Sequence, residues 1–248
     1  MEPADYQLMT SVEDTHWWNC ARREIIEVAI KRHTPIATDE PLRIVEVGCG
    51  SGGNLHMLSQ FGSAMGAEHE PSAIASLREK FGDRYPVIQH SIPEPLAGPF
   101  HVMGMFDVLE HIEDDAAALN WVADQLAPGG IAVITVPALP FLWSEHDQAA
   151  HHFRRYTQGS LLSAVPNSLD VAHVSYFNVL LLPIVVVALM SARLLPKRFR
   201  PQGTHMHLPP RAVNWLCYQI FRLERHLAPT FRIPTGVSLL LVLRKRSD

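Results

Sequence analysis

A glycine-rich turn at residues 48–53 (Gly-Cys-Gly-Ser-Gly-Gly) constrains the fold of this chain more than any other stretch. The β-branched apolar segment 43–47 before it predicts a buried strand, and residues 54–61 after it predict a helix. A strand, a tight turn and a helix N-terminus in this order allow backbone N–H groups to close on a nucleotide-like ligand. Glycine is required because a side chain at Gly48 or Gly50 would hold the backbone away from that ligand.

Two acidic residues near the turn define the ligand further. Glu46 lies two residues before the first glycine, where its carboxylate can face a positively charged group such as an ammonium. Glu68 follows about 20 residues later, where a carboxylate can accept both hydroxyl groups of a ribose. The spacing of Gly48, Gly50 and Gly53 also satisfies the dinucleotide fingerprint, so an NAD-binding oxidoreductase is an alternative interpretation of this turn.

From residue 42 onward the chain alternates between strand and helix patterns, which is typical of a doubly wound parallel sheet. Pro128 and the two glycines after it are expected to end the helix before the fifth strand. After the first strand, further strands are predicted at 63–68, 87–91, 99–107 and 131–136, and helices at 71–80 and 114–127.

Three motifs in this region fall in one characteristic order. Residues 46–52 match the pattern acidic-x-Gly-x-Gly-x-Gly, residues 108–112 (Val-Leu-Glu-His-Ile) follow the fourth strand, and residues 126–130 (Leu-Ala-Pro-Gly-Gly) precede the fifth. Together they resemble the motifs of the class I S-adenosylmethionine-dependent methyltransferases over residues 40–137. Glu46 and the Pro-Gly-Gly segment count against the NAD interpretation.

The resemblance implies a Rossmann-like α/β fold, a seven-stranded doubly wound sheet whose last two strands form an antiparallel pair. These strands are expected at 171–176 and 236–243. Residues 177–234 between them are then a helical insertion of 58 residues before the last strand. Residues 1–40 are expected to form an N-terminal helical cap on a methyltransferase domain that spans residues 41–248.

The cap contains an amphipathic pattern at residues 20–33, which predicts a helix. Trp17 and Trp18 precede this helix. Such a tryptophan pair is more often part of a hydrophobic core, but in this family an N-terminal segment commonly folds over the cofactor, so a role as a lid is the alternative.

The resemblance implies S-adenosyl-L-methionine as the cofactor. Glu46 and the glycines are expected around its methionine part, Glu68 at the ribose and Ser91 near the adenine. Many relatives have an acidic residue in place of Ser91. The predicted cofactor site comprises Glu46, Gly48, Cys49, Gly50, Asn54, Glu68, His69, Ser91, Asp107 and Val108.

Methyl transfer from a sulfonium is a direct displacement, so the protein mainly aligns the acceptor with the methyl carbon. An oxygen or nitrogen acceptor must also lose a proton, and a histidine is suited to take it. In an open α/β sheet the ligand lies at the carboxyl ends of the strands, so the loops after the fourth and fifth strands are expected to hold the acceptor. His111 and His146 in these loops are the predicted proton acceptors.

The same loops supply the predicted substrate contacts. Arg154 or Arg155 is expected to bind an anionic part of the substrate through paired hydrogen bonds. The predicted substrate-binding residues are Trp143, Asp147, His151, Arg154, Arg155 and Tyr156. Glu110, His111, His146 and Asp147 could in principle bind a divalent cation, but no ligand-spacing motif supports this, so no metal is predicted.

Charge is distributed unevenly along the chain. Residues 1–150 carry 22 acidic and 8 basic side chains, whereas residues 151–248 carry 3 acidic and 13 basic side chains. The basic part predicts either an anionic partner or pairing with the acidic part. The catalytic region lacks the strongly cationic surface that nucleic acid requires, so a small-molecule or lipid-like acceptor is expected.

The insertion begins with an apolar stretch, residues 177–192, that contains no charged residue. It is shorter than the roughly 20 residues that span a bilayer, and Pro183 interrupts it. Peripheral contact with a membrane through residues 177–200 is one interpretation, and a buried helix or a homodimer contact is the other. A second apolar helix is predicted at about 211–227.

Three unclustered cysteines, Cys20, Cys49 and Cys217, argue against disulfides and a zinc site, and the N-terminus has no signal-peptide pattern. A cytoplasmic protein is therefore expected, with contact to the cytoplasmic membrane face as the open question. A non-catalytic protein that binds S-adenosylmethionine also remains as an alternative, but the histidine- and arginine-rich loops count against it.

Overall fold

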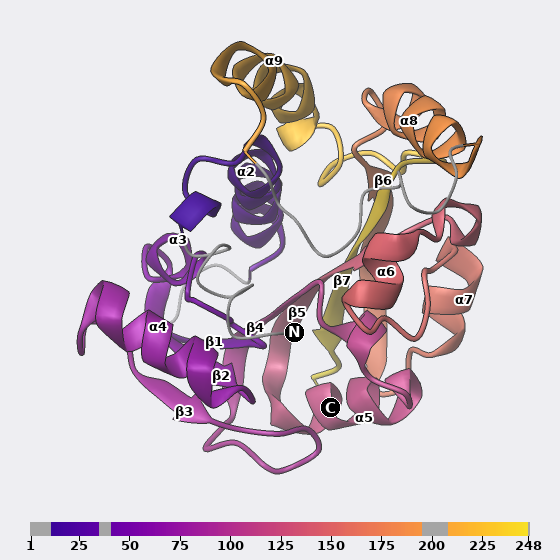
Figure 1. Ribbon diagram of the computed structural model, residues 1–248. Coiled ribbons are helices and arrows are strands. Elements are labelled where there is room, and N and C mark those ends of the chain that lie inside the picture. The colour runs from indigo at the N-terminus through magenta and orange to yellow at the C-terminus, as the bar shows by residue number, and fades with distance from the viewer. Residues whose placement is uncertain (1–10, 35–40, 195–207, 248) are drawn as a thin grey trace.

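The computed structural model describes residues 11–34, 41–194 and 208–247. In this part of the chain seven strands form one sheet in the order β3-β2-β1-β4-β5-β7-β6 (Figure 1). The first five strands run parallel, and β7 is antiparallel to both β5 and β6, which confirms the predicted fold class. The strands are β1 Leu42–Val47, β2 Gly62–Glu68, β3 Val87–Gln89, β4 Phe100–Phe106, β5 Leu126–Pro137, β6 Leu169–Phe177 and β7 Ser238–Lys245.

Helices cover both faces of the sheet because successive strand residues point to opposite sides. On β1, Ile44 packs in the hydrophobic cluster that includes α2, α3 and α4, whereas Val45 packs in the cluster that includes α5 and α7. The helices are α2 Trp17–His33, α3 Leu55–Leu58, α4 Pro71–Phe81, α5 Asp115–Gln125, α6 Glu145–Ala149, α7 Gln158–Ser163, α8 Leu182–Leu194 and α9 Arg211–Arg222. Short 3₁₀ helices are η1 Leu109–His111, η2 Pro140–Leu142 and η4 Leu223–Arg225.

The N-terminal helix α2 begins three residues earlier than the sequence pattern predicts. His16 caps it, since its Nδ1 accepts a hydrogen bond of 3.3 Å from Trp18 N, and both tryptophans therefore belong to the first turn. Phe221 of α9 contacts both rings, with centroids 5.8 Å from Trp17 and 5.2 Å from Trp18. These rings join α2 to α9, so the cap and the insertion pack against each other.

The segment around Pro128 differs from the prediction. Helix α5 ends at Gln125, and Leu126–Pro137 is a continuous strand, so Pro128 does not end the helix. Gly129 has φ of +73°, and a Cβ at Gly130 would lie 2.9 Å from Phe100 O. The glycines therefore allow the register between β4 and β5 to shift, and they do not mark the end of a helix.

The predicted insertion contains α8 and α9. In the described ranges no helix is both long enough and apolar enough to span a membrane. Helix α9 buries Phe221 against α2, whereas α8 buries none of its side chains. The division into a cap and a catalytic domain stays a prediction. Of the cap, residues 1–10 and 35–40 lie outside the described residues, as do Lys197, Arg198 and Arg200 of the insertion.

Candidate active site

A cleft of about 840 Å³ opens at the carboxyl ends of β1, β2 and β4. All ten residues of the predicted cofactor site line it. On its other side the cleft is lined by η1 and by residues of the segment 146–155, which contains His146 and four of the six predicted substrate-binding residues. The cleft therefore joins a cofactor half and an acceptor half, although ligand binding by these residues stays a prediction.

The glycine turn has the backbone that its sequence predicts. Gly48, Gly50 and Gly52 have φ of +67°, +54° and +82°, a region that other residues rarely adopt. A Cβ at Gly48 would lie 2.6 Å from Val108 Cγ2, and Gly48 N donates a hydrogen bond of 2.8 Å to Ala67 O. The turn is therefore held against β2, and no side chain fits at Gly48.

Glu46 lies at the end of β1 with only 2% of its surface exposed. Its Oε1 accepts a hydrogen bond of 2.6 Å from Asn54 Nδ2, while Oε2 is buried without a partner among the described residues. Burial raises the pKa of the Glu46 carboxyl to about 8. A buried carboxyl group with one unpaired oxygen is suited to bind the ammonium group of an amino acid. The positive charge of that ammonium would favour the ionised form of the carboxyl group.

We expect cofactor binding at pH 7 to release a proton from Glu46. Its raised pKa keeps the carboxyl protonated below pH 8 in the free protein, and a nearby ammonium lowers that pKa. Calorimetry with S-adenosylhomocysteine in phosphate and in Tris should therefore give different heats at pH 7. Identical heats in the two buffers would contradict this role.

Glu46→Gln is the matched variant, and it should lose both the proton release and part of the affinity. The affinity loss should be about 10-fold or more, as for a hydrogen bond to a charged group. The pKa of Glu46 is higher in the folded chain than in the unfolded chain, so the unfolded chain loses this proton first. The free energy of unfolding therefore decreases as the pH rises from 4.5 towards 8. The variant should therefore unfold at the same or a higher temperature at pH 8, which separates the loss of binding from a loss of folding.

Glu68 is fixed at the end of β2 by the backbone. Its Oε2 accepts from Gly50 N at 2.7 Å, and its Oε1 accepts from Glu70 N at 2.9 Å. Each oxygen keeps a further lone pair, so the carboxylate can still accept ribose hydroxyls. Beside it, His69 Nδ1 lies 2.8 Å from Ser91 Oγ, which places this pair at the predicted adenine end.

Helix α2 contributes a wall of the cleft, which the sequence raised only as an alternative for Trp17 or Trp18 and not for Asn19, Arg22 or Arg23. Trp18, Asn19, Arg22 and Arg23 all line the cleft. Arg22 forms an ion pair with Oδ2 of Asp107 at the end of β4, and Oδ1 of this carboxylate accepts from Thr135 Oγ1 at 3.1 Å. Asp107 has φ of +57°, and the contacts from Arg22 of α2 and Thr135 of β5 hold it in this conformation. Trp17 does not line the cleft, so a lid role can apply only to Trp18.

Three histidines gather in the acceptor half. The rings of His111 and His152 meet edge to face with centroids 4.6 Å apart, and the His146 ring lies 6.2 Å from His152. Burial, with His152 as a further cause, lowers the pKa of His111 to about 4, and burial also lowers the pKa of His146. Both predicted proton acceptors are exposed at the cleft surface and neutral at neutral pH. This is the form that can take a proton, and the lowered pKa makes each a weaker base than a free histidine.

Asp147 does not line the cleft but orients two residues that do. Burial alone would raise its pKa, but hydrogen bonds from His152 and Arg155 hold the pKa well below its usual range. Its Oδ1 lies 3.0 Å from His152 Nδ1 and 2.7 Å from Arg155 Nε, and its Oδ2 accepts from Ser144 N at 2.8 Å. These contacts favour a positioning role for Asp147, and its predicted contact with the substrate stays a prediction.

Three other predicted substrate residues, Trp143, Arg154 and Tyr156, also lie outside the cleft lining. Tyr156 is 1% exposed, and its hydroxyl donates to Asp115 Oδ2 at 3.0 Å. Arg154 pairs with the same carboxylate at 2.8 Å. Neighbouring residues of an extended segment point to opposite sides, so Arg155 faces the cleft while Arg154 and Tyr156 face away. His151 lines the cleft, as do His152 and Phe153, which are not among the predicted substrate-binding residues.

Glu110 lies beside the histidines and is fully buried. Neither of its carboxylate oxygens has a hydrogen-bond partner within the described ranges. Burial, and next the charge of Asp107, raise its pKa well above the usual value. Glu110, His111 and His152 offer atoms within 4.8 Å of one another that could bind a metal ion. The group differs from the sequence hypothesis, since His152 replaces His146 and Asp147.

We expect turnover to survive dialysis against EDTA. The raised pKa keeps Glu110 protonated, so a cation would have to displace its proton before binding. The measurement is the methyl-transfer rate before and after EDTA, with sodium chloride added to match ionic strength. A loss that Mg²⁺ or Zn²⁺ restores, and sodium chloride does not, would contradict the metal-free prediction.

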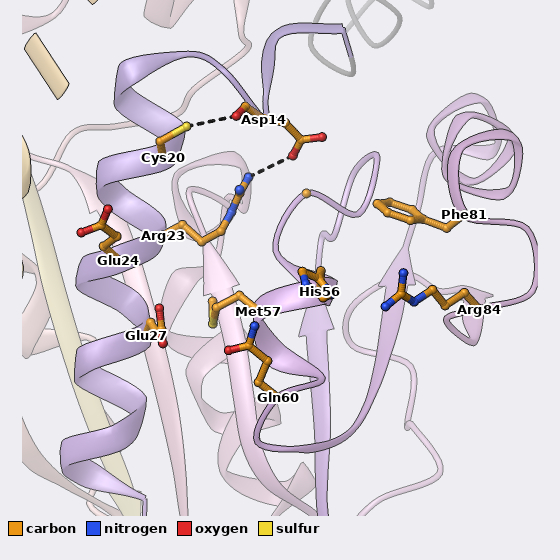
Figure 2. A pocket seen from close by; sticks show the side chains of 11 residues that line it. Asp14, Cys20, Arg23, Glu24, Glu27, His56, Met57, Gln60, Phe81 and Arg84 are labelled. Carbon is orange, nitrogen blue, oxygen red and sulfur yellow. Dashed lines mark hydrogen bonds and ion pairs between the residues drawn. The ribbon is translucent and has the colours of Figure 1, made fainter. Parts of the chain in front are cut away.

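A second hollow of about 530 Å³ lies against α2 and α3 (Figure 2). Asp14, Cys20 and Arg23 line it on one side, where Arg23 Nη2 lies 3.6 Å from Asp14 Oδ1 and Cys20 Sγ donates to Asp14 O. His56 and Arg84 line it on the other side. None of the predicted site residues lines this hollow, so the cofactor and the acceptor are assigned to the larger cleft.

Comparison with known proteins agrees with this geometry. Residues 21–217 match the family described as methyltransferase domain. A ubiquinone biosynthesis O-methyltransferase from Caulobacter sp. (strain K31) is 26% identical over 162 residues, which cover 54% of this chain and 62% of that protein. The chain therefore spans less than two thirds of this relative.

Two solved structures share the fold. One is the methyltransferase in complex with the Haloferax volcanii Trm112 methyltransferase activator, with a TM-score of 0.61, 18% identity, and coverage of 99% of this chain and 95% of that one. The other is an S-adenosylmethionine-dependent methyltransferase from Mesorhizobium loti, with a TM-score of 0.57, 17% identity, and coverage of 88% and 96%.

The fold and the family match together define the class of this protein. The chain belongs to the methyltransferase domain family, and its domain is that of an S-adenosylmethionine-dependent methyltransferase. This confirms the resemblance, the predicted fold class and the predicted cofactor.

Proposed function

We propose that the protein transfers the methyl group of S-adenosylmethionine to an oxygen or nitrogen of a small, lipid-like acceptor. The observation that supports this most strongly is the cleft that joins the ten predicted cofactor residues to His111 and His146, two solvent-exposed histidines whose lowered pKa keeps them neutral. Methyl transfer to a carbon would need a different activation of the acceptor, whereas an O–H or N–H acceptor needs only a base.

In this proposal the chain's own residues align and deprotonate the acceptor. S-adenosylmethionine supplies an electrophilic methyl group on sulfur. The residues of the acceptor half would hold the acceptor's heteroatom in line with the methyl carbon. His111 takes the acceptor's proton, and His146 is the alternative base. Asp147 holds His152 Nδ1 at 3.0 Å, which fixes the ring that packs edge to face on His111.

The walls of the acceptor half favour a largely apolar molecule. Ile112, which follows His111, and Phe153, which follows His152, line the cleft beside the histidines. Arg155, which lines the cleft from the segment 146–155, is already bound to Asp147 and to Ala138 O at 3.2 Å. The Caulobacter relative is named for ubiquinone biosynthesis, and a phenol on a lipid-like molecule fits an apolar pocket with a base.

A methyl-transfer screen tests this proposal. The protein is incubated with S-adenosylmethionine labelled on the methyl group and with organic or aqueous extracts of cells. We expect label in a compound that partitions into the organic phase. If label appeared only in nucleic acid or protein, the proposed acceptor class would be wrong. Cofactor binding without any labelled product would favour the non-catalytic alternative.

We also propose a cytoplasmic location, supported by three cysteines, Cys20, Cys49 and Cys217, that remain free thiols in the fold. Cell fractionation followed by detection of the protein in the cytoplasmic and membrane fractions checks this, and recovery from an oxidising compartment would contradict it.

A further inference from the structure

Exposed apolar side chains cover the two helices of the insertion and the turn after them. In Figure 1 both helices lie at the same end of the molecule, at the top of the view. Glu224 of η4 ties them together, because its two oxygens accept from Val179 N and Leu180 N just before α8. We call this surface the apolar end. Its exposed residues are Ile184, Val187, Met190 and Leu194 on α8, Val213, Trp215 and Leu216 on α9, and Leu223, Leu227 and Phe231 after it.

Helix α8 is the clearest sign that this surface has a partner. Its thirteen residues include Ile184, Val187 and Leu194, which are 62%, 65% and 88% exposed, and none of its side chains is buried. A helix that is apolar on all sides is normally buried in a core or in lipid. Within the described residues one side of α8 is half-buried, whereas the side with Ile184, Val187 and Leu194 is exposed, so this part of the chain presents an apolar helix face to water.

The charge of the same segment identifies the partner. The sequence of residues 177–234 contains eight basic residues and one acidic residue, Glu224. Glu224 is fully buried, so it adds no negative charge to the surface. Arg211 and Arg232 are exposed beside the apolar residues. A surface that is both apolar and cationic matches the interface of a membrane with anionic lipids.

We propose that the apolar end docks on a membrane surface that contains anionic lipids. None of the described helices can span a bilayer, so the apolar side chains would enter only the interfacial layer. Trp215 is 62% exposed on α9, and tryptophan favours this layer. A second copy of the chain fits less well, because a symmetric contact would bring the same positive charges together.

The apolar end also borders the cleft. Phe221 of α9 packs between Trp17 and Trp18, and Trp18 lines the cleft. On α8, Arg193 Nη2 donates to Phe141 O and Trp143 O, both at 2.8 Å, in the segment that follows β5. If the proposed lipid-like acceptor is correct, docking would place the cleft next to the phase that dissolves this acceptor. The docking itself does not depend on that acceptor.

Vesicle flotation tests the proposal without any need for turnover. The full chain is mixed with vesicles of phosphatidylcholine alone or of phosphatidylcholine with phosphatidylglycerol. We expect recovery with the vesicles that contain phosphatidylglycerol, and a decrease as salt is added. No flotation with these vesicles, or equal flotation with both kinds, would overturn the proposal. Because the assay measures binding alone, its failure would leave the proposed methyl transfer untouched.

Two pairs of variants locate the contact on the apolar end. Ile184→Ser with Val187→Ser removes two exposed apolar side chains from one face of α8 and should lower recovery strongly. Ile88→Ser with Val171→Ser removes two exposed apolar side chains elsewhere and should leave recovery unchanged. An equal loss in both pairs would overturn the assignment to this surface. Circular dichroism of each variant confirms that it is folded.

A second comparison tests the charges. Arg211→Gln with Arg232→Gln should lower the partition coefficient by about 25-fold, since each basic residue near an anionic surface contributes about 1 kcal/mol. Arg78→Gln with Arg84→Gln changes two exposed arginines on and after α4 and should have little effect. Light scattering in the absence of vesicles is the last check. A dimer that the α8 variant dissociates would overturn membrane docking in favour of self-association.

Discussion

Replacement of Gly48 by alanine should weaken the binding of S-adenosylhomocysteine by about 30-fold or more. Gly48 has φ of +67°, and a non-glycine residue there costs about 1–3 kcal/mol. The new Cβ would also lie 2.6 Å from Val108 Cγ2, so either the turn or Val108 must move. Both line the cofactor half of the cleft, so this movement would change the shape of the surface that contacts the ligand. Isothermal titration calorimetry measures this loss.

Gly82→Ala is the matched control for this prediction. Gly82 follows α4 with φ of +58°, and a Cβ there would meet no atom within 4 Å. The control therefore adds similar backbone strain far from the cleft, and should lower stability without changing affinity. Equal affinity for the ligand in Gly48→Ala and in the wild-type chain would show that the turn does not hold the cofactor.

Replacement of His111 by glutamine should lower kcat by about 10²–10⁴-fold, the usual contribution of a general base. Affinity for S-adenosylhomocysteine should change little, because His111 belongs to the acceptor half. His146→Gln distinguishes the two candidate bases. His56→Gln is the control, since His56 is exposed in the second hollow, where its Nδ1 lies 3.2 Å from Tyr85 Oη. Full kcat in both His111→Gln and His146→Gln would eliminate this mechanism.

The pH profile of the wild-type enzyme provides a second test of His111. The base must be neutral to accept a proton, and burial lowers the pKa of His111 to about 4. The rate should therefore stay constant as the pH falls from 7 to about 5 and then decline. Because the folded-state pKa lies below the usual 6.5, stability is also lost as the pH falls through this window. Circular dichroism at each pH separates the two effects.

The sheet and the glycine turn could be predicted because their signals are local. Residues 43–47 form a β-branched run before the glycines, and a buried parallel strand needs little else. The cofactor residues follow from this run, since the carboxyl ends of neighbouring parallel strands meet at one edge. Glu46, Glu68 and Asp107 are thus brought together by topology alone.

The remaining walls of the cleft could be predicted only in part, because their contacts are not local. Arg22 meets Asp107 across 85 residues of sequence, and no pattern in α2 marks this pairing. Which of Arg154 and Arg155 faces the cleft depends on the β-bridge between Ala138 and Tyr156. This bridge fixes which residues of the extended segment point towards the cleft. A shift by one residue would reverse which arginine faces the cleft.

The most direct test of the account is calorimetry of the wild-type chain with S-adenosylhomocysteine and, separately, with NAD. The glycine turn and the buried carboxyl of Glu46 should give micromolar affinity for S-adenosylhomocysteine, about −8 kcal/mol, and no measurable binding of NAD. Binding of NAD instead, or no heat with S-adenosylhomocysteine at millimolar concentration, would contradict the assignment of the cleft as the methyl-donor site.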